Sequence, residues 1–306
     1  MVYLTKPNKS DLQKSNAFRP ISLMQFFWKG LEKLLQYHNK KTCNRPARNY
    51  KQHGFREKYS TETALSVAGE IIEHSLINHN FALATCLDLT NCFGTLPFQP
   101  VIDQMTNIGC PQNFIEILTD FMKNRRISVE YKGVKIVKFC TAGQGQGSCI
   151  SPWAFSICCD ELLDAMDDIK DIKGAKLYIN AFADDLWVAS CGSNMQSIFK
   201  LMQTALDKCM EWANKNGLKF EPTKSSTCLH TRRHKYDISN LNVTLYDTPL
   251  QKVETYKYLG ITFDKKLSFI PHLDKKFNEA KRSIAKIWGH FSKLNGIKPQ
   301  FVILPV

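Results

Sequence analysis

The sequence predicts an α+β protein, in which one sheet is combined with helices that do not alternate regularly with its strands. One observation behind this prediction is a set of short apolar runs of strand length, such as residues 81–87, 176–182 and 186–191. Another is that the long segments between these runs carry apolar residues at helical spacing, for example from Met195 to Ala213. We expect the helices to cover one face of the sheet, with further insertions around it.

The first elements are two helices and a buried strand. Residues 23–36 carry apolar side chains at helical spacing, and a second helix is expected over residues 60–78. Ser60 and Thr61 are its N-cap candidates, because their hydroxyls can accept from the first free backbone amides. The nearly continuous apolar run 81–87 then indicates a strand that is buried on both faces.

The middle of the chain is predicted to contain helices, a hairpin and a loop. Helical segments continue to Asn124 and are broken at Pro111. Residues 127–131 and 134–139 alternate around Lys132-Gly133, which predicts a β-hairpin. A glycine-rich loop over residues 143–147 leads into an apolar helix over residues 152–166.

The last part should begin with a second hairpin, formed by residues 176–182 and 186–191. A helix follows, with Ser193 as its expected cap and Gly217 as its stop. Shorter strands are expected at residues 226–229, 242–245 and 256–263, and a final helix at residues 272–294.

Composition indicates a folded protein inside the cell. The chain has 306 residues, of which 43% are hydrophobic, so it can bury a sizeable core. It has no apolar stretch near the roughly 20 residues of a membrane span and no signal-peptide core, so we expect neither membrane insertion nor secretion. Eleven cysteines without a Cys-x-x-Cys pair favour free thiols in a reducing compartment.

The formal charge of +13 comes from 41 basic and 28 acidic residues. Such an excess suits a polyanionic partner, because basic side chains that contact phosphates release counterions. A solvated basic surface would give the same total. The grouping of basic residues along the last helix, at Lys275-Lys276 and Lys281-Arg282, favours nucleic-acid binding.

Adjacent carboxylates occupy the corner Phe182-Ala183-Asp184-Asp185 between two apolar runs. Aspartate is a common turn residue, so the corner alone is ambiguous. A third carboxylate, Asp88, ends the buried strand 81–87. Three carboxylates at one point would suit Mg²⁺, and two such ions can clamp the oxygens of a phosphoryl transfer, as in polymerases.

A series of motifs follows in the order found in reverse transcriptases. It consists of Lys6-Pro7-Asn8-Lys9, Phe18-Arg19-Pro20-Ile21-Ser22-Leu23, Gln52-His53-Gly54-Phe55-Arg56 with Ser60-Thr61, Asp88 with Phe93, Gln146-Gly147-Ser148 before Ile150-Ser151-Pro152, the Asp184-Asp185 corner, Leu218-Lys219-Phe220 with Lys224, and Tyr258-Leu259-Gly260. The chain resembles, over nearly its whole length, the reverse transcriptases of non-LTR (LINE-like, jockey-type) retrotransposons.

This resemblance implies the right-hand polymerase fold. Fingers would come from residues 1–80, the palm from 81–96 and 142–264 with an insertion shared by palm and fingers over 97–141, and a partial thumb from 265–306, which stops within the apolar run 301–306. The palm would be built on an antiparallel sheet. The activity implied is RNA-directed DNA synthesis, in which the partners are an RNA template, a DNA primer or duplex and deoxynucleoside triphosphates.

The resemblance also assigns roles to residues. Asp88, Asp184 and Asp185, with the backbone oxygen of Leu89, would hold two Mg²⁺ ions, with Mn²⁺ as an alternative. Phe93 would be the steric gate that excludes a 2′-hydroxyl. Residues that would contact the nucleotide are Lys6, Arg19, Asn91, Cys92, Gln146 and Gly147. Lys224 would donate a proton to pyrophosphate, and Tyr258, Leu259 and Gly260 would form the primer grip; Arg56 could face the template or be structural.

The sequence departs from the family at two places and leaves other readings open. Gly145 stands where proline is usual, and Asn91-Cys92 where Lys-Ala is usual. A group II intron-type enzyme and a viral RNA polymerase are enzyme alternatives, although Phe93 and Phe182 count against the latter. A decayed or domesticated copy that binds nucleic acid without catalysis is a further alternative. The family implies a nuclear location, while the oligomeric state is not readable from the sequence.

Overall fold

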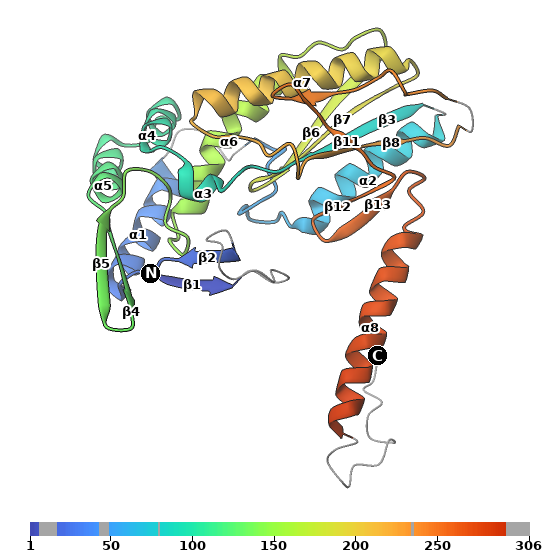
Figure 1. Ribbon diagram of the computed structural model, residues 1–306. Coiled ribbons are helices and arrows are strands. Elements are labelled where there is room, and N and C mark those ends of the chain that lie inside the picture. Colours follow the sequence, from blue (N-terminus) through green and yellow to red (C-terminus); the bar gives the residue numbers. More distant parts are fainter. Residues whose placement is uncertain (6–16, 43–48, 79, 234–235, 292–306) are drawn as a thin grey trace.

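The computed structural model describes residues 1–5, 17–42, 49–78, 80–233 and 236–291. Its centre is a five-stranded sheet with the order β11-β8-β3-β7-β6 (Figure 1). The strands are β3 (Phe81–Leu87), β6 (Lys176–Phe182), β7 (Asp185–Gly192), β8 (Ser226–His230) and β11 (Gln251–Lys252). The four longer strands pair antiparallel, and β11 runs parallel to β8 at the edge. The predicted strands of this sheet are confirmed, as is the α+β class.

Helices cover both faces of the sheet, so the expectation of one covered face was wrong. α6 (Ser151–Asp167) and α7 (Met195–Lys215) lie on the side of Leu83 and Val188. α2 (Thr61–Ile77) packs on the other side, against Ala82 and Ala84, together with a hairpin of β12 (Thr255–Tyr258) and β13 (Ile261–Asp264). Because β3 is apolar at every position except Thr85, each face needs its own cover.

The remaining elements lie beside one end of α6 or project from the sheet (Figure 1). Those beside α6 are β1 (Val2–Thr5), β2 (Phe18–Ile21), α1 (Phe26–Thr42), α3 (Cys92–Thr95), α4 (Phe98–Asn107), α5 (Gln112–Lys123), β4 (Arg126–Tyr131) and β5 (Val134–Phe139). β9 (Thr244–Leu245) and β10 (Thr248–Pro249) form a separate two-stranded sheet. α8 (Ile270–Phe291) extends away from the sheet. The predicted hairpin at Lys132-Gly133 and the helix break at Pro111 are confirmed.

The helix ends show which of the predicted caps and stops are correct. Ser60 caps α2 as predicted, because its side chain accepts from the amide of Thr63. The cap of α7 is Asn194 and not Ser193, since it is the Asn194 side chain that accepts from the amide of Ser197 at 3.0 Å. Gly217 has φ +63 just beyond this helix, in agreement with its predicted role as a stop.

Other expectations were confirmed in part or lie outside the described residues. The first helix begins and ends later than predicted, and the strand expected at residues 242–245 shrinks to Thr244–Leu245. The motif at Lys6, the end of the last helix beyond residue 291 and the run 301–306 lie outside the described residues. The proposed boundaries of fingers, palm and thumb stay predictions.

Two findings bear on the compositional analysis. In the described part of the chain, no helix combines the length and the apolar character that crossing a bilayer requires. The ten cysteines that the structure describes are all free thiols.

Candidate active site

The strand register brings the three predicted carboxylates to one end of the sheet. β3 pairs antiparallel with β7 so that Leu87 lies opposite Leu186, and the next step along both strands sets Asp88 beside Asp185. β6 and β7 form a hairpin closed by the pair Phe182 and Asp185, which leaves Ala183 and Asp184 as its two-residue turn. Asp184 is therefore at the hairpin tip, and Asp185 is the first residue of β7.

The electrostatics of this end of the sheet reflect the proximity of the carboxylates. Burial, reinforced by the negative charges of Asp184 and Asp88, raises the pKa of Asp185 to about 6. The Cys92 thiol donates a hydrogen bond to Asp184 Oδ2 at 3.5 Å. Burial raises the pKa of Cys92, and both Asp184 and Asp88 raise it further. The sheet end is thus a site of concentrated negative charge that a cation would stabilise.

A lysine ammonium contacts one of these carboxylates. Lys224 Nζ donates to Asp88 Oδ2 at 3.1 Å, in an ion pair where both side chains reach solvent. Within the described residues, no group of three or more His, Cys, Asp or Glu side chains is arranged so that it could hold a metal ion. The carboxylate oxygens at the ends of the adjacent strands are nevertheless the type of ligand that hard divalent cations prefer.

The segment after Asp88 is fixed by its neighbours. The backbone oxygen of Asp88 accepts from the amide of Glu221 at 2.8 Å, so the chain continues beside residues 219–221 through Leu89. Asn91 then has φ +47 and leads into α3, which carries Cys92 and Phe93. The Phe93 ring is half-buried against Phe155, with ring centroids 5.0 Å apart, so its position is set by α6.

The glycine-rich loop fits between two other segments. The amide of Gln144 donates to the Phe93 oxygen at 2.5 Å, and the amide of Ser22 donates to the Gln146 oxygen at 2.7 Å. A Cβ at Gly143 would lie 2.4 Å from the backbone oxygen of Gly94, and one at Gly147 would lie 2.7 Å from that of Ser22. Both glycines also have positive φ, so the lack of space for a Cβ and the backbone conformation each favour glycine at these positions.

Sequence reasoning missed two side chains that hold this loop. Buried Glu32 of α1 accepts from the Ser148 hydroxyl at 2.5 Å and from the amide of Cys149 at 2.8 Å. Arg125 Nη2 donates to the Gly143 oxygen at 2.6 Å. A buried glutamate in an otherwise amphipathic helix is a weak signal in the sequence, because its partners lie more than a hundred residues away.

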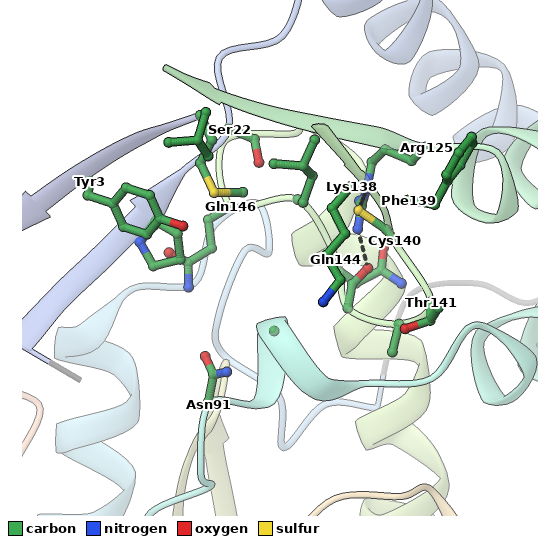
Figure 2. Close-up of a pocket in the computed structure, with 18 of the residues that line it drawn as sticks. Tyr3, Ser22, Asn91, Arg125, Lys138, Phe139, Cys140, Thr141, Gln144 and Gln146 are labelled. Atoms are coloured by element: carbon green, nitrogen blue, oxygen red, sulfur yellow. Dashed lines mark hydrogen bonds between the residues drawn. The ribbon is translucent and has the colours of Figure 1, made fainter. Parts of the chain in front are cut away.

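A pocket of 540 Å³ opens beside the loop (Figure 2). Asn91 and Gln146, both predicted nucleotide contacts, line it together with Tyr3 and Ser22. Gly145 is also part of the wall, and a Cβ there would lie 3.3 Å from Arg125 Nη1. The unusual glycine therefore fits tightly against Arg125.

Arg19, Cys92 and Gly147, the other predicted nucleotide contacts that the structure describes, do not line this pocket. Arg19 is exposed on β2, opposite Leu4 of β1. The thiol of Cys92 is buried against Asp184, and Gly147 is exposed at the end of the loop. Arg56 is engaged structurally, because its guanidinium lies 4.0 Å from the Tyr59 ring centroid and donates to the Asn49 oxygen.

The predicted primer grip is the β12–β13 hairpin, whose turn is Leu259-Gly260. Both turn residues have positive φ, +45 and +93, as two-residue hairpins favour. The Tyr258 side chain is only 3% exposed and stacks on Trp187, with centroids 6.4 Å apart. Tyr258 thus anchors the hairpin on the sheet, whereas Lys257 on the opposite face of β12 and Gly260 in the turn are exposed.

The four longer strands of the sheet are antiparallel, carboxylates gather at the ends of two adjacent strands, and helices and a glycine loop surround them. This arrangement is that of palm-type polynucleotide polymerases. Comparison with known proteins gives the family. A family model described as reverse transcriptase (RNA-dependent DNA polymerase) matches residues 6–263, and the chain belongs to this family. Reverse transcriptases of this family use divalent metal ions.

Individual relatives agree with this assignment. The chain is 24% identical over 290 residues to an RNA-directed DNA polymerase from the mobile element jockey of Drosophila funebris, covering 94% of this chain and 31% of that protein. A probable RNA-directed DNA polymerase from transposon BS of Drosophila melanogaster is also 24% identical, with coverage of 89% and 30%. The chain therefore matches a domain of non-LTR retrotransposon proteins and spans about a third of their length.

Among solved structures, a telomerase from Candida tropicalis in complex with a TWJ fragment of telomeric RNA is similar in fold. The TM-score is 0.52 at 11% identity, and the match covers 78% of this chain and 36% of the telomerase. This likeness confirms the polymerase fold predicted from the sequence.

Proposed function

We propose that this chain is the catalytic domain of an RNA-directed DNA polymerase, which adds deoxynucleotides to a primer 3′-hydroxyl. The observation that carries the proposal is the register of β3, β6 and β7, since it brings Asp88, Asp184 and Asp185 to one end of the sheet. Membership of the reverse transcriptase family supports the same reaction.

The acidic residues fit a divalent cation site. Asp88 and Asp184, aided by Asp185 and the backbone oxygen of Leu89, would hold two Mg²⁺ ions, for which Mn²⁺ could substitute. When bound, such ions favour deprotonation of the primer hydroxyl and neutralise the leaving pyrophosphate. Lys224 now balances part of the charge of Asp88. In the reaction it would turn from Asp88 and donate a proton to pyrophosphate.

Other residues would select and hold the nucleotide. Phe93, fixed by Phe155, would lie beneath the sugar and clash with a 2′-hydroxyl. The exposed Arg19 can engage phosphate oxygens with two parallel hydrogen bonds. Gln146 would lie at the nascent base pair and Asn91 would contact the nucleotide, as their place in the pocket wall supports.

The proposed macromolecular partners are an RNA template and a DNA primer or duplex. The net charge of +13 supports a polyanionic partner. Lys275, Lys276, Lys281 and Arg282 are exposed on the projecting helix α8, where they could follow a phosphate backbone. We further propose that the parent protein acts in the nucleus, because its relatives are encoded by mobile elements.

Primer extension on an RNA template tests the proposal. The unaltered chain should extend a DNA primer with deoxynucleotides in the presence of Mg²⁺. Asp184→Ala should lower the rate by roughly 100-fold or more, since even second-shell changes at metal sites cost 10–100-fold. Gel-shift titration should show that the variant still binds template–primer.

Undiminished extension by Asp184→Ala would contradict the catalytic assignment. Binding of template–primer by the unaltered chain without any incorporation would instead select the non-catalytic nucleic-acid-binding role.

A further inference from the structure

The side chain of Gln52 lies beneath the acidic turn and binds both backbone groups of Ala183. Gln52 is fully buried, although it is polar. Its Oε1 accepts from the amide of Ala183 at 2.9 Å and from the amide of Gly54 at 2.8 Å. Its Nε2 donates to the Ala183 oxygen at 3.3 Å. One glutamine thus holds the residue that directly precedes Asp184.

The turn needs such support because Ala183 is in a costly conformation. Its φ is +56, in the left-handed region that residues with a Cβ enter only at an energetic cost. Ala183 and Asp184 are the whole turn between the paired residues Phe182 and Asp185. A change of φ at Ala183 would therefore redirect Asp184, because no other residue in the turn can absorb it.

The backbone around Gln52 is itself fixed to the sheet. The amide of His53 donates to the Ala181 oxygen at 2.8 Å, and the amide of Ala181 donates to the Lys51 oxygen at 2.9 Å. These bonds form a parallel bridge beside the end of β6. Gly54 completes the contact, since a Cβ there would lie 2.3 Å from the amide nitrogen of Ala183.

The same segment is tied to helices on both faces of the sheet. His53 Nδ1 lies 2.7 Å from the Thr63 hydroxyl of α2. Asn49 Nδ2 donates to Asp164 of α6 at 2.7 Å. Gln52 is therefore a rigid support, since its backbone position does not depend on the acidic turn.

We propose that Gln52 is a positioning residue, which holds Ala183 in the left-handed conformation and thereby directs the Asp184 carboxylate toward its metal ion. Gln52 contacts no substrate and acts only through the turn. This inference rests on the proposed polymerase function. It adds a specific role for the Gln52-His53-Gly54 segment, in which the glutamine supplies the bonds and the glycine supplies the space.

The first test replaces Gln52 by leucine, which has a similar volume and forms no hydrogen bond. We expect the kcat of nucleotide addition to fall roughly 10–100-fold, while KM for the nucleotide and affinity for template–primer change less than about 3-fold. The affinity for Mn²⁺, measured from the electron paramagnetic resonance signal of the free ion, should fall as well. Gln99→Leu, at an exposed glutamine of α4, is the matched control and should leave all of these values unchanged.

A second test uses rescue. Glycine enters positive φ without the cost that alanine bears. Ala183→Gly should therefore restore several-fold of the lost kcat and Mn²⁺ affinity in the Gln52→Leu background, and change them less than about 3-fold in the unaltered chain. A purely structural role for Gln52 would give no such rescue. If Gln52→Leu does not fold, as judged by thermal unfolding, Gly54→Ala displaces the same turn while Gln52 is kept, and should show the same losses.

Each outcome has one meaning. Wild-type kcat and Mn²⁺ affinity in folded Gln52→Leu, or equal losses with and without Ala183→Gly, would overturn the positioning role. If the unaltered chain extends no primer, the polymerase function fails instead. The Mn²⁺ titrations then still decide whether Gln52 positions the carboxylate.

Discussion

Phe93 is the proposed steric gate, and its surroundings hold it in place. Its ring packs against Phe155 of α6, and its backbone oxygen accepts from the amide of Gln144, so both the ring and the backbone are supported. A fixed aromatic ring excludes a hydroxyl by steric clash, and a small side chain removes that clash.

Phe93→Ala should therefore admit ribonucleotides. We expect the ratio of kcat/KM for deoxynucleotides to that for ribonucleotides to fall roughly 10–100-fold, chiefly through the ribonucleotide value. Single-nucleotide addition with each triphosphate measures the ratio, and Phe121→Ala, on α5, is a control that should leave it unchanged. Unaltered sugar selectivity in Phe93→Ala would remove the gate.

Single residues also show what a sequence can and cannot predict at the site. Asp88, Asp184 and Asp185 could be singled out because each ends or begins an apolar run, and strand ends are legible in the sequence. Gln52 and Glu32 could not be assigned by such reasoning. Their importance comes from buried bonds to Ala183 and Ser148, which lie 131 and 116 residues away.

At the level of elements, hydrophobic periodicity predicted most strands and helices. It did not predict which helices cover which face of the sheet. The run Phe81–Leu87 gave β3 with the right bounds. That run is apolar at every position except Thr85, and its prediction as a strand buried on both faces was correct, although the helices were expected on one face only. The small residues Ala82 and Ala84, where α2 approaches, are the signal that identifies the second face.

Helix capping gives a prediction at this scale. Asn194→Ala should lower the free energy of unfolding by about 1 kcal/mol, because the amide of Ser197 loses its acceptor. Ser193→Ala, one residue earlier and exposed, should change it by less than about 0.5 kcal/mol. Urea unfolding of both variants measures the difference. Equal losses, or a larger loss for Ser193→Ala, would contradict the assigned cap.

For the whole molecule, a buried histidine at the end of β8 predicts a pH dependence of stability. His230 is fully buried, and its Nε2 lies 3.3 Å from the Tyr256 hydroxyl. Burial lowers the pKa of His230 from 6.5 to about 4. Between these values the unfolded chain binds the proton and the folded chain does not, so the unfolded state is favoured as the pH falls.

Stability from this source should be complete above about pH 6.5 and lost as the pH falls toward 4, by roughly 3 kcal/mol in total. Urea unfolding between pH 7 and pH 4.5 measures the trend. His230→Phe should flatten it, whereas His74→Gln, at an exposed histidine of α2, should retain it. The prediction is wrong if His230→Phe shows the slope of the unaltered chain.

At the same scale, the central claim is that folding gathers Asp88, Asp184 and Asp185 into one divalent cation site. The most direct measurement is anomalous scattering from Mn²⁺ in crystals of the chain with template–primer and an incoming nucleotide. We predict peaks bonded to oxygens of Asp88 and Asp184, with Lys224 no longer paired to Asp88. Mn²⁺ bound elsewhere, with the contact between Lys224 and Asp88 unchanged, would contradict the account.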